Sequence, residues 1–205
     1  MGKDFKEAIS ILLCRNCGRN LKEAIKVDRV VCDCGFKYPI LDQKILYANP
    51  TSLDLFPEKR MRDKQASNYL SHNKFPTQIS SVKRFLSGLP TTLDEGISLD
   101  LACGPGPYTK MLSNHSDAVL AVDFSSTSLD IASSSITNAS VFFIQADLND
   151  FYVEKESCSI LLMADFLQHI DGLEKQENLL KRMFSSLKLG GYFYLSFFNP
   201  NLKNI

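Results

Sequence analysis

Four cysteines near the N-terminus have the types and spacing of a metal site. They lie within 21 residues, at Cys14, Cys17, Cys32 and Cys34. Two close pairs of thiolates are a donor set that Zn²⁺ prefers, and a glycine after each pair allows the positive φ that closes a knuckle. The second pair is one residue short of CxxC. Alternate residues of a strand point to opposite faces, so the backbone must bend there for both thiolates to bind one ion.

The residues between the two cysteine pairs, 21–31, read as a strand, a turn and a strand. Two knuckles on paired hairpins predict a small β zinc ribbon, with a structural Zn²⁺ held by the four cysteines. A metal-free module of this size has little core of its own, so the metal would also stabilise the fold. The alternative is a metal-free remnant held by a small apolar core.

A second group of residues able to do chemistry is a glycine-rich loop in the C-terminal half. The segment Asp100 to Gly106 reads DLACGPG and follows an apolar run. Its glycines allow a tight turn and the close approach of a ligand, and a helix N-terminus with unpaired N–H groups follows. Asp123 ends the next apolar run, 17 residues after Gly106, where a carboxylate can accept both hydroxyls of a ribose.

Two cofactor classes use a loop of this kind. A dinucleotide-binding loop would have a third glycine at the position of Thr109. A carboxylate before the loop, Asp100, suits a cationic amino-acid head better than a pyrophosphate. The residues favour an amino-acid-bearing nucleoside, and an NAD-linked oxidoreductase stays as an alternative.

Short apolar runs alternate with amphipathic segments from residue 97 onward. Strands are expected at 97–103, 119–122, 141–144, 159–163 and 192–198, with helices near 107–114, 126–135, 165–170 and 174–187. This alternation predicts right-handed βαβ units and a parallel sheet covered on both faces. Helical segments are also expected near 61–72 and 77–88. The chain divides into a ribbon module (1–48), a helical linker or cap (49–90) and an α/β domain (91–205).

The α/β part resembles the class I S-adenosylmethionine (SAM) methyltransferases. The resemblance rests on DLACGPG, Asp123, the segment Gln145–Leu148, the segment Ala164–Ile170 and the turn Leu187–Tyr192, in that order. It implies a Rossmann-like parallel sheet, SAM as cofactor and a cofactor-binding set of Asp100, Ala102, Gly104, Gly106, Asp123, Phe124, Asp147, Leu148 and Ala164.

The resemblance also implies individual roles. Asp100 and the loop would hold the methionine part of SAM, and Asp123 the ribose. Phe124 would lie beside the adenine and Asp147 would receive its amino group. The segment from Ala164 would face the transferred methyl, which makes Asp165 and His169 candidates for catalysis, although a histidine on such a turn is more often structural.

The segment after the second cysteine pair carries a further resemblance. Tyr38-Pro39-Ile40 in this place is similar to the zinc ribbon of small methyltransferase-activating proteins. The sequence departs from that family at Gln43, where a glycine is usual, and in its shortened second knuckle.

The net charge of zero conceals two halves of opposite sign. Residues 1–90 carry a net charge of +7 and residues 91–205 a net charge of −7. A basic half is compatible with an RNA acceptor, and the methyl acceptor is expected to be a small molecule or RNA. Compositional drift is the alternative explanation. The chain has no apolar run long enough for a membrane helix and no signal-peptide pattern, so a cytoplasmic protein without a membrane partner is expected.

The sequence ends shortly after the fifth expected strand of the α/β part, whereas the resembled fold continues with a helix and two more strands. We therefore expect a sheet truncated after its fifth strand, with an apolar edge open to a partner or to self-association. The predicted function is a SAM-dependent methyltransferase. The alternative is a non-catalytic module that binds SAM or a partner.

Overall fold

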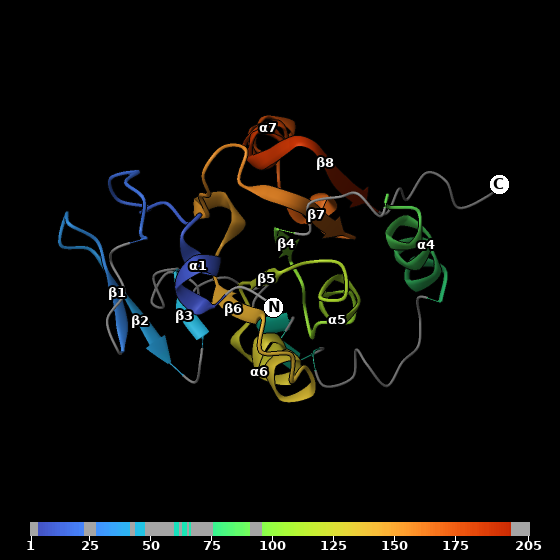
Figure 1. The fold of residues 1–205 in the computed structure, drawn as a ribbon, viewed down its shortest axis with the longest axis horizontal. Helices are drawn as coiled ribbons and strands as arrows, with labels where there is room; N and C mark the ends of the chain where they lie inside the picture. The colour runs from blue at the N-terminus through green and yellow to red at the C-terminus, as the bar shows by residue number, and fades with distance from the viewer. Residues whose placement is uncertain are drawn as a thin grey trace.

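A central eight-stranded sheet organises the protein in a computed structural model that describes residues 4–22, 28–41, 44–47, 60–61, 63–64, 66, 76–90 and 96–197. The strand order is β1-β2-β3-β6-β5-β4-β7-β8 (Figure 1). The strands are β1 (Arg29–Val31), β2 (Lys37–Leu41), β3 (Lys44–Leu46), β4 (Ile97–Leu101), β5 (Ala118–Asp123), β6 (Val141–Gln145), β7 (Cys158–Ala164) and β8 (Leu187–Ser196). The helices are α1 (Phe5–Ile9), α4 (Pro76–Ser87), α5 (Thr109–Leu112), α6 (Ser126–Ser135) and α7 (Leu173–Ser186), with 3₁₀ turns η1 (Leu148–Asp150) and η2 (Leu167–His169).

The strands β4 to β8 form the parallel sheet that the alternating pattern predicts. Their pairings β6–β5, β5–β4, β4–β7 and β7–β8 are all parallel. The chain builds outward from β4 to β5 and β6, and then returns to the other side of β4 for β7 and β8. Ligands of open α/β sheets bind at the carboxyl ends of the strands where the order reverses, which here is beside β4.

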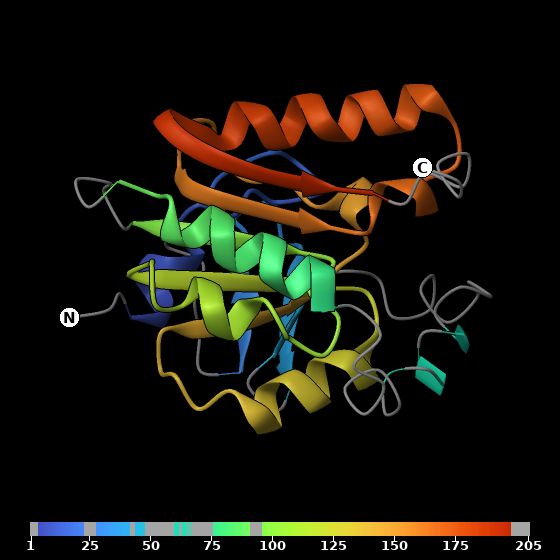
Figure 2. The same cartoon turned by 90° about the vertical axis from the view of Figure 1, so that its right-hand side faces the viewer.

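Helices and the N-terminal segment cover the two faces of this sheet. On one face, α4, α5 and α6 lie in front of the strands in Figure 2, and they bury Val82, Leu112 and Leu129 against alternate residues of β5 and β7. On the other face, Leu179 and Met183 of α7 and residues of the N-terminal segment share a second core. The uniformly apolar strands follow from this double coverage, because side chains of both orientations are buried.

The N-terminal strands extend the same sheet. Strand β1 pairs antiparallel with β2, and β2 pairs antiparallel with β3. Strand β3 then pairs parallel with β6, so that Lys44 lies opposite Phe143. The prediction of a sheet that stops at five strands is therefore wrong. Local patterning predicts a separate ribbon for these residues, whereas the pairing of β3 with β6 makes all three strands part of one eight-stranded sheet.

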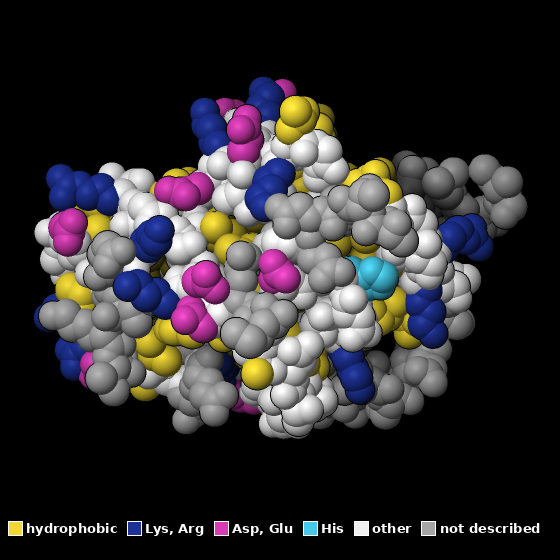
Figure 3. All heavy atoms as spheres, viewed as in Figure 1, with side chains coloured by type: hydrophobic (Ala, Val, Ile, Leu, Met, Phe, Trp, Pro, Cys, Tyr) yellow, Lys and Arg dark blue, Asp and Glu magenta, His cyan; other side chains and the backbone are white. Residues whose placement is uncertain are grey.

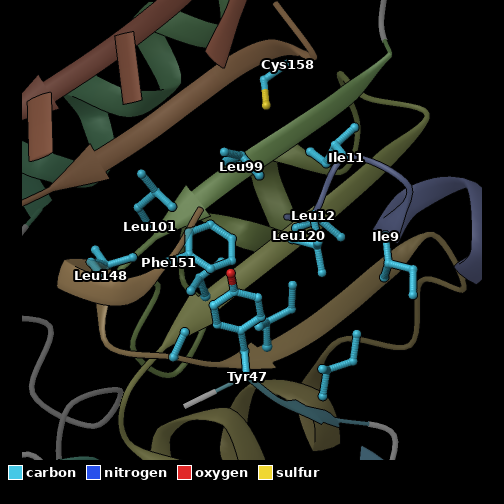
Figure 4. Close-up of a cluster of buried hydrophobic side chains, with 14 of the residues drawn as sticks. Ile9, Ile11, Leu12, Tyr47, Leu99, Leu101, Leu120, Leu148, Phe151 and Cys158 are labelled. Atoms are coloured by element: carbon cyan, nitrogen blue, oxygen red, sulfur yellow. The ribbon is translucent and has the colours of Figure 1, made fainter. Parts of the chain in front are cut away.

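Tyr47 marks the seam between the N-terminal segment and the α/β part. Its backbone N–H donates to the Gln145 carbonyl and its hydroxyl donates to the Leu13 carbonyl. Its ring lies against the ring of Phe151, with centroids 5.4 Å apart, inside a cluster that also holds Leu12 and Leu120 (Figure 4). The two parts of the chain thus share one apolar core.

The beginning of β8 differs from the expected helix-to-strand turn at 187–191. These residues belong to the strand, and the register against β7 shifts between the pairs Cys158–Leu187 and Ile160–Tyr192. Gly190 has φ +79°, a backbone conformation typical of a bulge. Two adjacent glycines therefore indicate a bulged strand here.

Several expectations lie partly outside the described residues. Residues 23–27 of the strand–turn–strand segment do so, as does most of the expected helix at 61–72. Within the expected helix, the described residues 61, 63, 64 and 66 are helical. Helix α4 begins and ends within one residue of its prediction. In the described part of the chain, no helix has both the length and the apolar character needed to cross a membrane.

Candidate functional site

A cavity of about 620 Å³ opens at the carboxyl ends of β4, β5, β6 and β7. This volume is within the usual range for a small-molecule or cofactor site. Its walls come from the segments that follow these four strands, with one residue from the 60s: Ala66, Ala102, Cys103, Gly104, Pro105, Pro107, Tyr108, Asp123, Phe124, Ser128, Ala146, Asp147, Leu148, Asn149, Ala164, Asp165, Phe166, Gln168, His169, Ile170, Asp171 and Lys175. Nine of the eleven predicted cofactor and catalytic residues line it, and Asp100 and Gly106 do not.

Asp123 joins two walls of the cavity. It is only 6% exposed, its Oδ2 accepts from the Gly104 N–H at 2.8 Å, and its Oδ1 accepts from the Ser125 N–H at 2.9 Å. Ser125 in turn caps α6, because its hydroxyl accepts from the Ser128 N–H. The carboxylate is therefore held at the edge of the cavity by the glycine-rich loop on one side and the start of α6 on the other.

Asp100 lies behind the loop and is fully buried. Its Oδ2 accepts from the Thr109 hydroxyl at 2.6 Å. Burial raises the pKa of Asp100 to about 7, the hydrogen bond from Thr109 lowers it in part, and the negative charge of Asp123 raises it again. The sequence singled out Thr109 only as the place of a missing glycine, whereas the structure uses its side chain to tie the loop to β4.

The two glycines of the loop serve different purposes. Both have positive φ, +55° at Gly104 and +82° at Gly106. A Cβ at Gly104 would meet no atom within 4 Å, whereas a Cβ at Gly106 would lie 2.8 Å from Ile136 Cδ1 and 3.1 Å from Ala132 Cβ. Gly104 faces the cavity, and Gly106 lets the loop pack against the end of α6.

The segments after β5 and β6 form a second part of the lining. Phe124 follows Asp123, and its carbonyl accepts from the Gln145 amide at 3.0 Å. Asp147 precedes η1, and its Oδ1 accepts from both the backbone N–H and the side-chain amide of Asn149, each at 2.9 Å. Leu148 is buried beside it. These contacts place three predicted cofactor residues on one side of the cavity.

The catalytic candidates lie on the opposite wall, after β7. Asp165 follows Ala164 and has φ +53°, a strained conformation for a residue with a side chain. It is held there by Ser196, whose carbonyl accepts from the Asp165 N–H at 2.9 Å and whose hydroxyl donates to Asp165 Oδ1 at 3.2 Å. His169 lies at the end of η2 and is exposed. The two side chains share a wall of the cavity.

The four predicted metal ligands come together at the end of the molecule that carries β1 and β2. Their Sγ atoms all lie within 4.8 Å of one another. Two sulfur pairs are closest, Cys14 with Cys34 at 3.7 Å and Cys17 with Cys32 at 3.5 Å. Four thiol sulfurs converging on one point match the donor set of a tetrahedral Zn²⁺ site.

The shortened second knuckle converges because its residues do not form a strand. The Gly35 N–H donates to the Cys32 carbonyl, the Cys32 N–H donates to the Phe36 carbonyl, and Gly35 has φ +85°. This tight turn removes the alternation of side chains that a strand would impose. Hydrogen-bond donors also approach the sulfurs. The Tyr38 hydroxyl donates to Cys14 Sγ at 3.2 Å. The Asn16 amide donates to Cys34 Sγ, and this hydrogen bond is the main cause that lowers the pKa of Cys34 to about 6.

Charged side chains are mixed on the face shown in Figure 3. Lys and Arg side chains lie among Asp and Glu side chains, both over the N-terminal strands and around α7. Although the first half of the sequence is basic, the described residues on this face therefore do not form one continuous basic surface.

Comparison with known proteins bears on the α/β part. Residues 99–195, just under half of the chain, match the family described as Methyltransferase domain. DhpI in its complex with SAM and HEP is 26% identical with a TM-score of 0.55, over 66% of this chain and 64% of the DhpI chain. The DhpI–SAH complex has the same identity and TM-score, over 66% of this chain and 65% of that chain. These findings support a class I methyltransferase.

Other comparisons are less specific. The PH0226 protein from Pyrococcus horikoshii OT3 is 20% identical with a TM-score of 0.56, over 72% of this chain and 64% of that chain, and it shows the fold alone. No curated protein sequence matches this chain. The chain spans less than two thirds of the length of the DhpI chains that it matches.

The different surroundings of the two loop glycines lead to a matched pair of predictions. Gly106→Ala should lower the free energy of unfolding by about 1–3 kcal/mol, because the new methyl meets α6 at a positive φ. Gly104→Ala has the same backbone strain without the clash, so it should cost less stability and instead narrow the cavity. Urea unfolding of both variants measures the difference, and equal losses would contradict the packing role of Gly106.

The raised pKa of Asp100 predicts a pH-dependent stability. The pKa of the unfolded carboxyl lies near its ordinary value of 3.8 and that of the folded one near 7, so between these pH values the folded state binds more protons. The free energy of unfolding should therefore fall as the pH rises from about 4 to 7, by up to about 4 kcal/mol, and then level off. Asp100→Asn, which keeps an acceptor for Thr109, should lack this loss. Urea unfolding from pH 5 to 8 without ligand tests the prediction, and a pH-independent difference between the two proteins would refute it.

Proposed function

We propose that the protein is a SAM-dependent methyltransferase that binds its cofactor in the cavity beside β4 and transfers the methyl group to a small molecule or an RNA. The observation that carries the proposal is the position of the buried Asp123. Two backbone N–H groups hold it at the edge of a cavity that lies beside β4, where the strand order of the sheet reverses. The match of residues 99–195 supports the same assignment.

The lining residues divide between the parts of the cofactor. Asp123 would accept the two ribose hydroxyls, and Phe124 would lie along the adenine, whose amino group would donate to Asp147. Ala102 and Gly104 would allow the methionine part to approach the backbone of the loop. Asp100, which lies behind the loop and contacts Thr109, would fix the loop rather than touch the cofactor.

When bound, SAM supplies a methyl group that its sulfonium already activates. The work of the chain is then to align an acceptor with that methyl and to keep water out, which can account for several kcal/mol of the barrier. The wall that bears Ala164, Asp165 and His169 would receive the acceptor. A general base is needed only for an acceptor that must lose a proton, and Asp165 and His169 are the candidates on this wall.

The cysteine cluster would hold a structural Zn²⁺ with Cys14, Cys17, Cys32 and Cys34 as its four ligands. Two of these cysteines are buried and two exposed, and none lines the cavity. The metal would cross-link the first knuckle to the turn before β2 and so stabilise the N-terminal segment. We further propose that residues 1–48 are a cysteine-bearing extension of the sheet, residues 49–90 a linker or cap, and residues 91–205 the SAM-binding part.

Isothermal titration of the purified chain with SAM and with NAD tests the cofactor. SAM should bind and NAD should not. Asp123→Ala should weaken SAM binding on the order of 100-fold, because two hydrogen bonds to a charged group are lost. Asp28→Asn, an exposed aspartate paired with Arg29 outside the cavity, is the matched control and should bind as the parent does.

Methyl release from SAM with RNA or small-molecule extracts as acceptors then separates an enzyme from a binding module. Turnover with either acceptor class supports the methyltransferase. Tight SAM binding without turnover on both classes favours the non-catalytic module, and failure to bind SAM would refute both.

Metal content tests the cysteine cluster. The purified chain should hold one equivalent of zinc by elemental analysis, and Cys14→Ser should lose it, because a neutral hydroxyl replaces a thiolate ligand. Cys158→Ala removes a buried thiol outside the cluster and should keep the metal. Retention of a full equivalent by Cys14→Ser would exclude the proposed ligand set.

A further inference from the structure

The chain that follows β6 forms one wall of the cavity through an irregular segment, residues 147–154. Its first residues, Asp147, Leu148 and Asn149, line the cavity, and the 3₁₀ turn η1 then carries the chain away to Phe151, which is fully buried. Buried irregular backbone needs hydrogen-bond partners from elsewhere in the fold. The source of those partners decides how firmly this wall of the cavity is held.

Arg182, from the middle of α7, supplies two of them. Its Nη2 donates to the Leu148 carbonyl at 2.9 Å and its Nη1 donates to the Phe151 carbonyl at 3.1 Å. The guanidinium carbon also lies 4.7 Å from the centre of the Tyr152 ring. One planar group therefore bridges the two ends of η1, a geometry that suits the fixed fork of an arginine.

The far side of the segment is held by the N-terminal part of the chain. The Leu13 N–H donates to the Tyr152 carbonyl at 3.0 Å, and the Glu154 N–H donates to the Ile11 carbonyl at 2.8 Å. The Phe151 ring packs against Tyr47, as Figure 4 shows. Residues 151–154 thus have anchors besides Arg182. Closer to the cavity, the Leu148 carbonyl accepts from Arg182, and Asp150 pairs with Arg15 at 3.8 Å.

The docking of α7 on the sheet does not require the Arg182 head group. Leu179 and Met183 of the same helix are each 1% exposed in the shared core, and they supply its apolar contact. The guanidinium instead reaches past the helix to the turn that carries Asp147. Removal of its head group should therefore loosen the turn while the helix stays in place.

We propose that Arg182 is a positioning residue for the cofactor, which holds the η1 turn so that Asp147 meets the adenine amino group and the site selects adenine. This inference rests on the proposed function, in which Asp147 receives that amino group. It adds a residue on a distant helix, with no atom in the cavity lining, to the determinants of cofactor selectivity.

The test compares two ligands that differ at the adenine amino group. Titrations with S-adenosylhomocysteine and S-inosylhomocysteine give a preference ratio for each variant, and the inosine base lacks the amino donor. The parent chain should prefer the adenosine ligand by roughly 10-fold or more, as expected for one hydrogen bond to a charged acceptor. Arg182→Gln should lower that ratio to roughly 3-fold or less. Arg182→Lys, with one donor group in place of a fork, should fall between them.

Two further variants make the outcomes separable. Lys181→Gln, at an exposed neighbouring position paired with Glu177, should keep the parent ratio. Asp147→Ala should abolish the preference. If Asp147→Ala abolishes it and Arg182→Gln leaves it unchanged, the positioning role is refuted while the proposed function stands. If the parent shows no preference, or Asp147→Ala leaves the ratio unchanged, the adenine contact fails and this inference fails with it.

Amide hydrogen exchange gives a readout that does not depend on ligand. In Arg182→Lys and Arg182→Gln, residues 148–151 should exchange faster than in the parent, while the amides of α7 keep their protection. Equal acceleration in α7 and in the turn would show a general loss of packing and overturn the proposal. If Arg182→Lys keeps the exchange rates and the preference ratio of the parent, a positive charge alone explains the effect of Arg182. That result would also overturn the proposal.

Discussion

The geometry of the cavity depends on one carboxylate. Asp123 accepts a hydrogen bond from the loop after β4 and another from the segment that starts α6, so a single rigid group sets the position of both. Hydrogen bonds to an ionised acceptor are roughly twice as strong as neutral ones. The charge also acts on Asp100 behind the loop, where it adds to burial in raising the pKa of that carboxyl. Two aspartates at the ends of neighbouring strands thus have different surroundings: Asp123 borders the cavity, whereas burial raises the pKa of Asp100 beneath it.

Features that depend on neighbouring residues could be predicted from the sequence. Helix α6 begins and ends where its pattern indicates, and β5 and β7 each extend one residue beyond their predicted bounds at each end. Most of the predicted site residues also line the cavity, because the carboxyl ends of parallel strands meet at one edge and the polar residues there belong together. Such features can be predicted from two local signals. One is the spacing of apolar residues, with a period of two in strands and 3.6 in helices, and the other is the change from apolar to polar residues at the end of an element.

Features that depend on distant contacts could not be predicted. The pairing of β3 with β6 has no local signal, because an apolar strand of three residues is equally consistent with a ribbon and with the edge of a larger sheet. Thr109 and Arg182 act through side chains that reach other elements, and nothing in their neighbours along the chain indicates those partners. The shortened cysteine knuckle requires a bend of the backbone for its two thiolates to converge, and the turn at Gly35 supplies that bend.

The parallel pairing of β3 with β6 has a consequence for how the protein is made. Lys44 lies opposite Phe143, 99 positions later in the chain, so the ribosome must synthesise β4, β5 and β6 before β3 can pair with β6. At usual synthesis rates this takes roughly 5 to 20 s. Through that interval the side chains of Ile45 and Tyr47, each 1% exposed in the folded protein, have no sheet to cover them. The contacts among the four cysteines span only 21 residues and can form at once. The first part of the chain to be synthesised is therefore among the last to reach its final place, which leaves an early window for chaperones and for misassembly.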